Sequence, residues 1–106
     1  MMPLTIRTPE QIEAEAMDAH KARVVAAIDA HVEAQAQAMG YNGAAHLASY
    51  VASGVAEWAA EAQAFVAWRD AVWQAALGLL ADAEASGDLL SVEDALAALP
   101  DWPGVE

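Results

Sequence analysis

The sequence predicts an all-α fold in which two long helices pack as an antiparallel hairpin. Helix-start and helix-stop residues enclose two stretches of about 30 residues that contain no internal proline after the first turn, and no run of residues alternates between apolar and polar as a strand would. Alanine, the best helix former, makes up about half of the apolar residues. We expect helices at about residues 9–39, 43–53, 55–86 and 92–99.

The first long helix begins at a capping sequence. Thr8 supplies a hydroxyl cap, Pro9 occupies the first helical position, and Gln11 follows three residues after the cap, as in a capping box. Gly40 stands where a left-handed residue commonly ends a helix. The segment 9–39 would therefore be about 45 Å long at a rise of about 1.5 Å per residue.

A turn and a short helix lead into the second long helix. The segment 40–43 supplies turn residues, and Asn42 is suited to cap a short helix that Gly54 ends. The second long helix then covers 55–86 and ends at Gly87. Tight connections of this kind join antiparallel neighbours.

The C-terminal part contains one more short helix and a tail. Ser91 is followed by acids in the first turn, which predicts a helix over about 92–99 that Pro100 stops. The chain then divides into an N-terminal arm at 1–8, a single helical domain at 9–99 and an extended tail at 100–106.

Bulky side chains concentrate on the helix 55–86. At about 100° per residue they cover roughly half of its circumference, at Trp58, Phe65, Trp68, Val72, Trp73, Leu77, Leu79 and Leu80. The other side is mostly alanine and glycine, so a second helix could approach it closely. The helix 9–39 has only a thin apolar stripe, made of Ile12, Val24, Val25, Ile28, Val32 and Met39.

The helix 55–86 has more apolar surface than the helix 9–39 can cover. Because a single hairpin has little interior, we expect a homo-oligomer or docking to a larger partner. The expected contact residues are Trp58, Phe65, Trp68, Arg69, Val72, Trp73, Leu77, Leu80 and Trp102. The alternative is that the short helices 43–53 and 92–99 fold back over this surface.

Arg69 lies within the apolar half of the helix 55–86, where a charge needs a partner. We expect an ion pair with Asp29 or Glu33 of the first long helix. The alternatives are helix-terminal carbonyls or an acid on another copy.

The composition excludes several classes of protein. With 16 acidic and 4 basic residues, the formal charge is −12, which argues against binding to nucleic acid or to an anionic membrane. An apolar content of 58% argues against a disordered acidic chain. The lack of cysteine excludes disulfides, thiol catalysis and Cys-based zinc sites. Neither a secretory signal nor a membrane-spanning segment is predicted.

The three histidines do not form a metal-binding or catalytic pattern. His20 and His31 share one face of a helix but are separated by about 16 Å, and His46 pairs with Tyr50 at the i,i+4 spacing of a local contact. No phosphate-binding loop or nucleophile motif occurs. We therefore expect no catalysis, no cofactor and no metal site.

Four segments form a recognisable pattern within residues 18–103, at 40–43, 49–50, 61–73 and 96–100. Together they resemble a family of small tail-associated proteins of tailed bacteriophages and prophages of proteobacteria, often described as tail proteins or tail fibre assembly proteins. The most specific segment is Trp68-Arg69-Asp70-Ala71-Val72-Trp73.

The resemblance implies a non-enzymatic structural or adaptor component near the tail tip or tail fibres. Such a protein would be made in the cytoplasm of the bacterial host and built into the virion, where threefold and sixfold sites favour a trimer. The alternative is a tail fibre or tail assembly chaperone that the virion does not retain. Some of these chaperones end with an aromatic–Arg helix and a Trp-Pro segment, to which Trp68-Arg69 and Trp102-Pro103 are similar, but their usual upstream domain is missing here.

Overall fold

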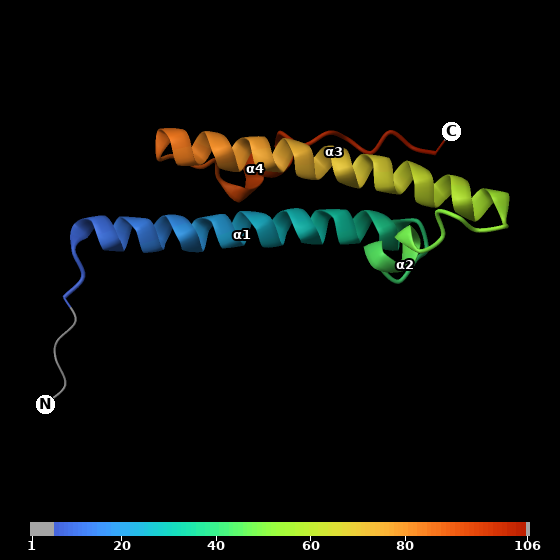
Figure 1. Cartoon of the computed structure of the whole chain (residues 1–106), viewed down its shortest axis with the longest axis horizontal. Coiled ribbons are helices and arrows are strands. Elements are labelled where there is room, and N and C mark those ends of the chain that lie inside the picture. Colours follow the sequence, from blue (N-terminus) through green and yellow to red (C-terminus); the bar gives the residue numbers. More distant parts are fainter. Residues whose placement is uncertain (1–5, 106) are drawn as a thin grey trace, which may run out of the picture.

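The computed structural model describes residues 6–105, which form four helices and no strand. They are α1 (Pro9–Ala38), α2 (Ala44–Ala48), α3 (Ala56–Ser86) and α4 (Val92–Ala97). The long helices α1 and α3 lie side by side in opposite directions (Figure 1). The predicted all-α hairpin is therefore confirmed, and the bounds of both long helices agree with the prediction to within one residue.

Local signals set both ends of α1. The Thr8 hydroxyl accepts a hydrogen bond from the Gln11 backbone N–H, and the Gln11 side chain accepts one from the Thr8 N–H, which completes the predicted capping box. At the other end Gly40 has φ of 94°, and the Tyr41 N–H donates to the Ala36 carbonyl in a Schellman arrangement. The expected start and end of this helix are confirmed.

The short helix α2 differs from the prediction. It covers five residues rather than 43–53, and Asn42 does not cap it. The cap comes from another helix, because Oε1 of Glu33 on α1 accepts a hydrogen bond from the Ala44 N–H at 3.1 Å. Gly43 allows this approach, since a Cβ there would collide with the Glu33 carboxylate.

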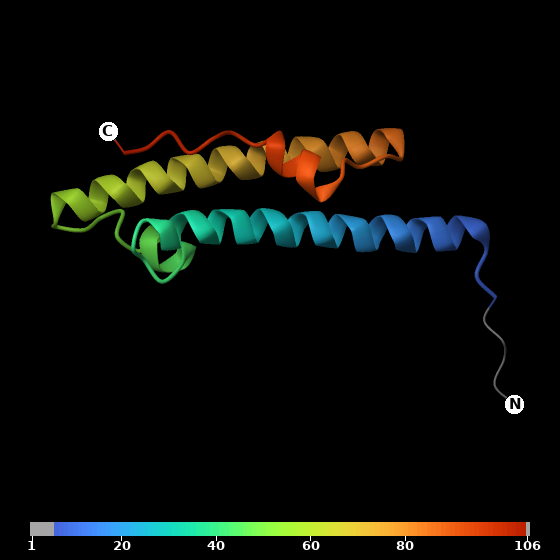
Figure 2. The ribbon, with the colours of Figure 1, turned by 180° about the vertical axis from the view of Figure 1, so that it is seen from behind.

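The C-terminal segment folds back over the hairpin. The Ser91 hydroxyl caps α4 as predicted, but α4 ends at Ala97 instead of 99, and Leu99 packs into the core after the helix has ended. In Figure 2, α4 lies in front of the seam between α1 and α3, and in Figure 1 it lies behind. One face of the hairpin is thus covered by α4, and we call the opposite face the open face.

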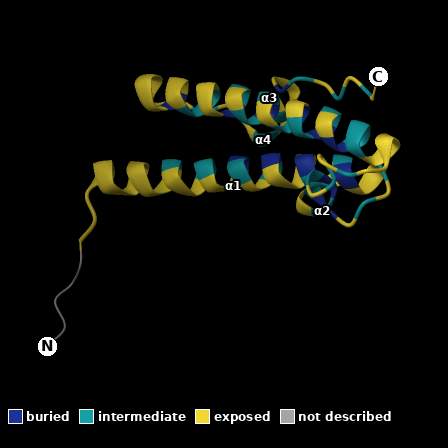
Figure 3. Cartoon of the chain, turned by 45° about the vertical axis from the view of Figure 1, so that its right-hand side comes forward, coloured by how far each residue is buried: buried dark blue, intermediate teal, exposed yellow. Residues whose placement is uncertain are grey.

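The core follows the seam between the long helices (Figure 3). Its members are Val24, Ile28, Val32 and Ala36 from α1, Ala62, Phe65, Trp68, Val72 and Ala76 from α3, Leu47 from α2, and Ala95 and Leu99 from the C-terminal segment. Both short helices therefore contribute to it, as the fold-back alternative predicted. Two alanines of α3, Ala62 and Ala76, are fully buried in this core.

The two long helices are offset along their length. The first turns of α1 extend beyond the end of α3, and α3 begins beyond the end of α1 (Figure 1). Ile12 and Trp58 lie in these overhangs, and they are 52% and 46% exposed, although both were expected in the apolar faces that meet. The described chain is accordingly elongated, with extents of 64 × 34 × 19 Å.

Candidate functional site

Trp68 is the centre of the contacts between α3 and the C-terminal segment. Its indole N–H donates to the Pro100 carbonyl at 2.9 Å, and its ring meets the edge of the Trp102 ring at a centroid distance of 5.6 Å. The His31 ring of α1 packs on it from another side. Trp68 is only 4% exposed, and Phe65 and Val72 are fully buried. These three predicted contact residues belong to the core of the chain itself and have almost no surface to offer to a partner.

The alanine side of α3 faces the C-terminal tail. Residues 98–105 are not helical, and they run along α3 (Figure 1). An open groove of about 500 Å³ lies between them, lined on the helix by Ala60, Ala64, Ala67 and Ala71 and on the tail by Pro100, Asp101, Pro103 and Gly104. The small side chains that would have let a second helix approach closely thus face the tail of the same chain.

Arg69 does not form the predicted ion pair with α1. Its Nη2 and Nε donate to the same Asp70 oxygen at 3.1 and 3.3 Å, and about a third of its side chain is exposed. Arg69 lies about 100° around α3 from the buried Trp68, so its guanidinium reaches water at the edge of the apolar face. The expected partner Glu33 instead caps α2.

Three apolar side chains of α3 form a stripe toward the open face. Trp73, Leu77 and Leu80 follow one another at spacings of four and three residues, which places them on one side of the helix. Leu77 is nine residues from Trp68, or about half a turn around the axis, and so points away from the tail. Leu77 is 62% exposed, and Trp73 and Leu80 are half-buried. We call these residues the exposed stripe.

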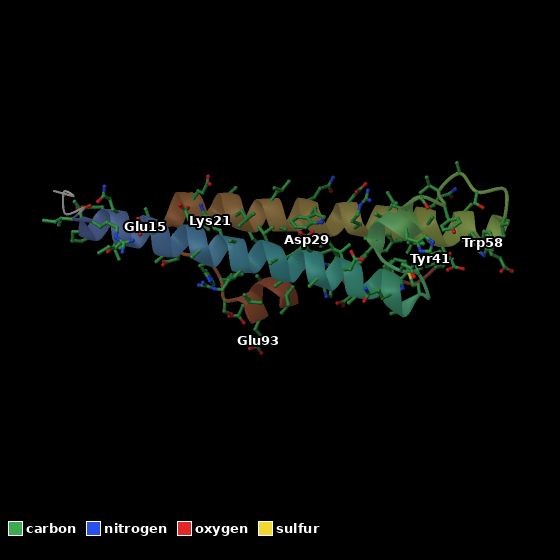
Figure 4. All side chains as sticks on the ribbon, turned by 90° about the horizontal axis from the view of Figure 1, so that it is seen from below. Glu15, Lys21, Asp29, Tyr41, Trp58 and Glu93 are labelled. Atoms are coloured by element: carbon green, nitrogen blue, oxygen red, sulfur yellow. The ribbon has the colours of Figure 1, made fainter. Side chains whose placement is uncertain are left out.

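On α1, the flank that bears His20 and His31 faces the C-terminal segment. His20 Nε2 lies 2.8 Å from the Leu90 carbonyl, and the His31 ring contacts Trp68. Asp29 lies on the other flank, since it and Glu93 of α4 appear on opposite sides of α1 in Figure 4. Among residues 6–105, no group of three or more His, Asp or Glu side chains is placed to hold a metal ion.

Aromatic rings gather where α2 meets the beginning of α3. The His46 ring lies 5.5 Å from the Tyr41 ring and 5.4 Å from the Tyr50 ring, and the Tyr50 ring lies 5.6 Å from the Trp58 ring. Figure 4 shows Tyr41 and Trp58 at this end of the molecule. We call these four residues the aromatic cluster.

Hydrogen bonds fix the His46 ring within the aromatic cluster. The Asn42 backbone N–H donates to Nδ1 at 3.0 Å, which leaves Nε2 to donate to the Tyr50 hydroxyl at 3.3 Å. The predicted local pair of His46 and Tyr50 is confirmed. The spacing of these two residues was the only sequence signal for the cluster, because Tyr41 and Trp58 reach it through the tertiary fold.

The Tyr41 phenol has a shifted pKa. Partial burial, and next the charge of the Glu61 carboxylate, raise the pKa of Tyr41 above the ordinary value of 10.0. Both causes disfavour the phenolate, so the ring is neutral at physiological pH. A negative side chain therefore lies beside an aromatic cluster that carries no negative charge of its own.

Comparisons of the chain with protein-family models, with curated proteins and with solved structures found no match. No helix within residues 6–105 has the length and apolar character needed to cross a membrane.

Proposed function

We propose that the protein is a non-enzymatic component of a bacteriophage tail, located near the tail tip or the tail fibres. It acts by helix packing, as a homo-oligomer or against other tail proteins. The tail assignment is based on the resemblance of the segment 68–73 to tail-associated proteins. The mode of action is based on the exposed stripe.

The exposed stripe is the observation that supports association. On the open face α2 covers only the end of the seam where α1 stops and α3 starts. Trp73, Leu77 and Leu80 lie further along α3, and Leu77 is 62% exposed. Burying a side chain such as Leu77 against a partner would contribute about 1–2 kcal/mol. A trimer that joins three open faces would bury three copies of the stripe and would fit a threefold site.

A tail fibre or tail assembly chaperone is the second candidate. In that role Trp102 and the apolar part of α3 would hold a client protein. Trp102 packs against Trp68 of its own chain, and Leu99 is buried beside it. This internal packing favours the structural role, because a chaperone would first have to release its tail.

Mass spectrometry of purified virions separates the two roles. An integral tail component is present in whole-number ratio to the other tail proteins, whereas a chaperone is found in the lysate of infected cells but not in virions. Its presence in the lysate in complex with a tail or fibre protein, but not in virions, would reject the structural role in favour of the chaperone. Its absence from virions and from every complex with a tail or fibre protein would reject the tail assignment altogether.

A further inference from the structure

A pocket opens on the aromatic cluster. It has a volume of about 330 Å³. The rings of Tyr41, His46, Tyr50 and Trp58 line it together with the Glu61 side chain, and Met39 and Gly40 complete the wall. Trp58 is 46% exposed because α3 begins beyond the end of α1, so its ring is available at the mouth of the pocket. Several aromatic surfaces and one carboxylate therefore meet at a place that solvent can reach.

The charges around the pocket are of one sign. Glu61 forms part of the wall, and Glu57 lies one turn earlier on α3. Arg69 is the closest basic residue along α3, about 12 Å further on, and it is paired with Asp70. The other basic side chains, Arg7, Lys21 and Arg23, lie in or before the first half of α1, at least about 22 Å of helix from its end at Ala38, where the pocket begins. No cation of the described chain is positioned to fill the pocket.

The rings themselves carry no compensating positive charge. His46 accepts a hydrogen bond at Nδ1 from the Asn42 N–H, which is the arrangement of a neutral imidazole. Neutral aromatic faces attract cations through their quadrupole, and a nearby carboxylate adds a direct charge interaction. The pocket thus has the chemistry of a site for an organic cation.

We propose that this pocket binds the guanidinium group of an arginine side chain presented by a partner protein. A guanidinium is planar and weakly hydrated, so it can stack on a ring such as Trp58 while its N–H groups donate to Glu61. An ammonium is more strongly hydrated and cannot stack in this way. The formal charge of −12 attracts a basic partner to the whole molecule, and the pocket selects one side chain of it. This inference does not depend on the tail assignment.

Titration with blocked amino acids, followed by NMR, tests the proposal on the intact chain. Nα-acetyl-arginine amide should shift the ring signals of Tyr41, Tyr50 and Trp58 in a saturable way. Nα-acetyl-citrulline amide has nearly the same shape without the charge, and it should cause no saturable shift. Nα-acetyl-lysine amide should bind at least about threefold more weakly than the arginine compound. Equal binding of all three compounds, or no shift of these rings by the arginine compound, would overturn the proposal.

Two glutamates of α3 provide a matched pair of variants. Glu61→Gln removes the carboxylate from the pocket wall and should weaken binding of the arginine compound about threefold or more. Glu57→Gln removes the same charge one turn away, outside the pocket wall, and should change binding less than about twofold. Similar losses in both variants would show attraction by net charge alone and would overturn the proposed site. Unchanged ring signals outside the pocket would verify that each variant is folded.

Discussion

At Gly43 the backbone passes so close to Glu33 that no side chain fits between them. The Glu33 carboxylate uses this space to accept the Ala44 N–H and so caps α2 from α1. Because Gly43 has no side chain, Glu33 of α1 can hold the turn that reverses the chain through its hydrogen bond to Ala44.

Gly43→Ala should lower the free energy of unfolding by about 1 kcal/mol, because the added Cβ displaces the capping carboxylate. Urea denaturation measures this change. Gly54→Ala is the control, since a Cβ there meets open space, and it should leave stability unchanged or raise it by up to about 1 kcal/mol.

The cause can be isolated in a Glu33→Ala background. In this background Gly43→Ala should lower the free energy of unfolding by much less, because the cap has already been removed. An equal cost in both backgrounds would contradict the capping role.

Tyr41 provides a prediction about pH. Because burial and Glu61 raise the pKa of Tyr41 above 10.0, the unfolded chain loses this proton at lower pH than the folded chain does. The contribution of Tyr41 to stability is therefore complete below about pH 10 and falls as the pH rises from there through the folded pKa. Ultraviolet titration of the native protein should show a phenolate component with a midpoint above 10.0 that is missing in Tyr41→Phe. In Glu61→Gln this midpoint should move down, and an unchanged midpoint would contradict the contribution of Glu61.

At the scale of elements, the C-terminal segment stays on α3 through a few contacts of Trp68. The indole hydrogen bond to Pro100 and the edge-on contact with Trp102 are the polar and aromatic parts of this attachment. They let a non-helical tail cover the alanine side of a helix that has no bulky residues there.

Trp102→Ala should release the tail and lower the free energy of unfolding by about 2 kcal/mol. Hydrogen exchange should become faster at the Trp68 indole N–H and at the tail amides, while the amides of α1 keep their protection. Val105→Ala changes an exposed residue of the same tail and should alter stability by less than about 0.5 kcal/mol. Unchanged exchange at the Trp68 indole in Trp102→Ala would show that Trp102 does not hold the tail.

At the scale of the whole molecule, the chain is long and thin. Its radius of gyration is 18.4 Å, whereas a compact domain of this size would have about 13 Å. A chain of this shape leaves much of α3 near the surface. The exposed stripe toward the open face is therefore accessible to a partner in the proposed association.

Leu77→Glu should weaken self-association at least about tenfold, because it places a charge in the middle of the exposed stripe. Sedimentation equilibrium of wild type and variant at tens of micromolar measures this effect. Ala34→Glu adds the same charge at an exposed position of α1, and it should change self-association little. A wild-type chain that is strictly monomeric over this range would contradict the oligomer.

Predictions that depend on neighbouring residues in the sequence were correct, whereas those that depend on tertiary contacts were wrong. Both ends of α1 and the start of α4 depend on residues within a few positions, such as Thr8, Gly40 and Ser91, and these were predicted correctly. The bounds of α2 and the partner of Arg69 were predicted wrongly. The start of α2 depends on its cap by Glu33, which is eleven positions away from Ala44 in the sequence. Arg69 pairs with Asp70 because its guanidinium lies at the edge of the core and not inside it.

The sequence by itself determined the helices, because their caps, breaks and alanine content act through local backbone geometry and intrinsic preference. Only the tertiary structure decided which bulky side chains of α3 are buried in the core and which are exposed on the surface. It buried Phe65, Trp68 and Val72, left Leu77 exposed, and brought Tyr41 and Trp58 together at one end. The physical reason is that the offset of two helices and the path of a tail depend on long-range packing, which the periodicity of a single helix does not contain.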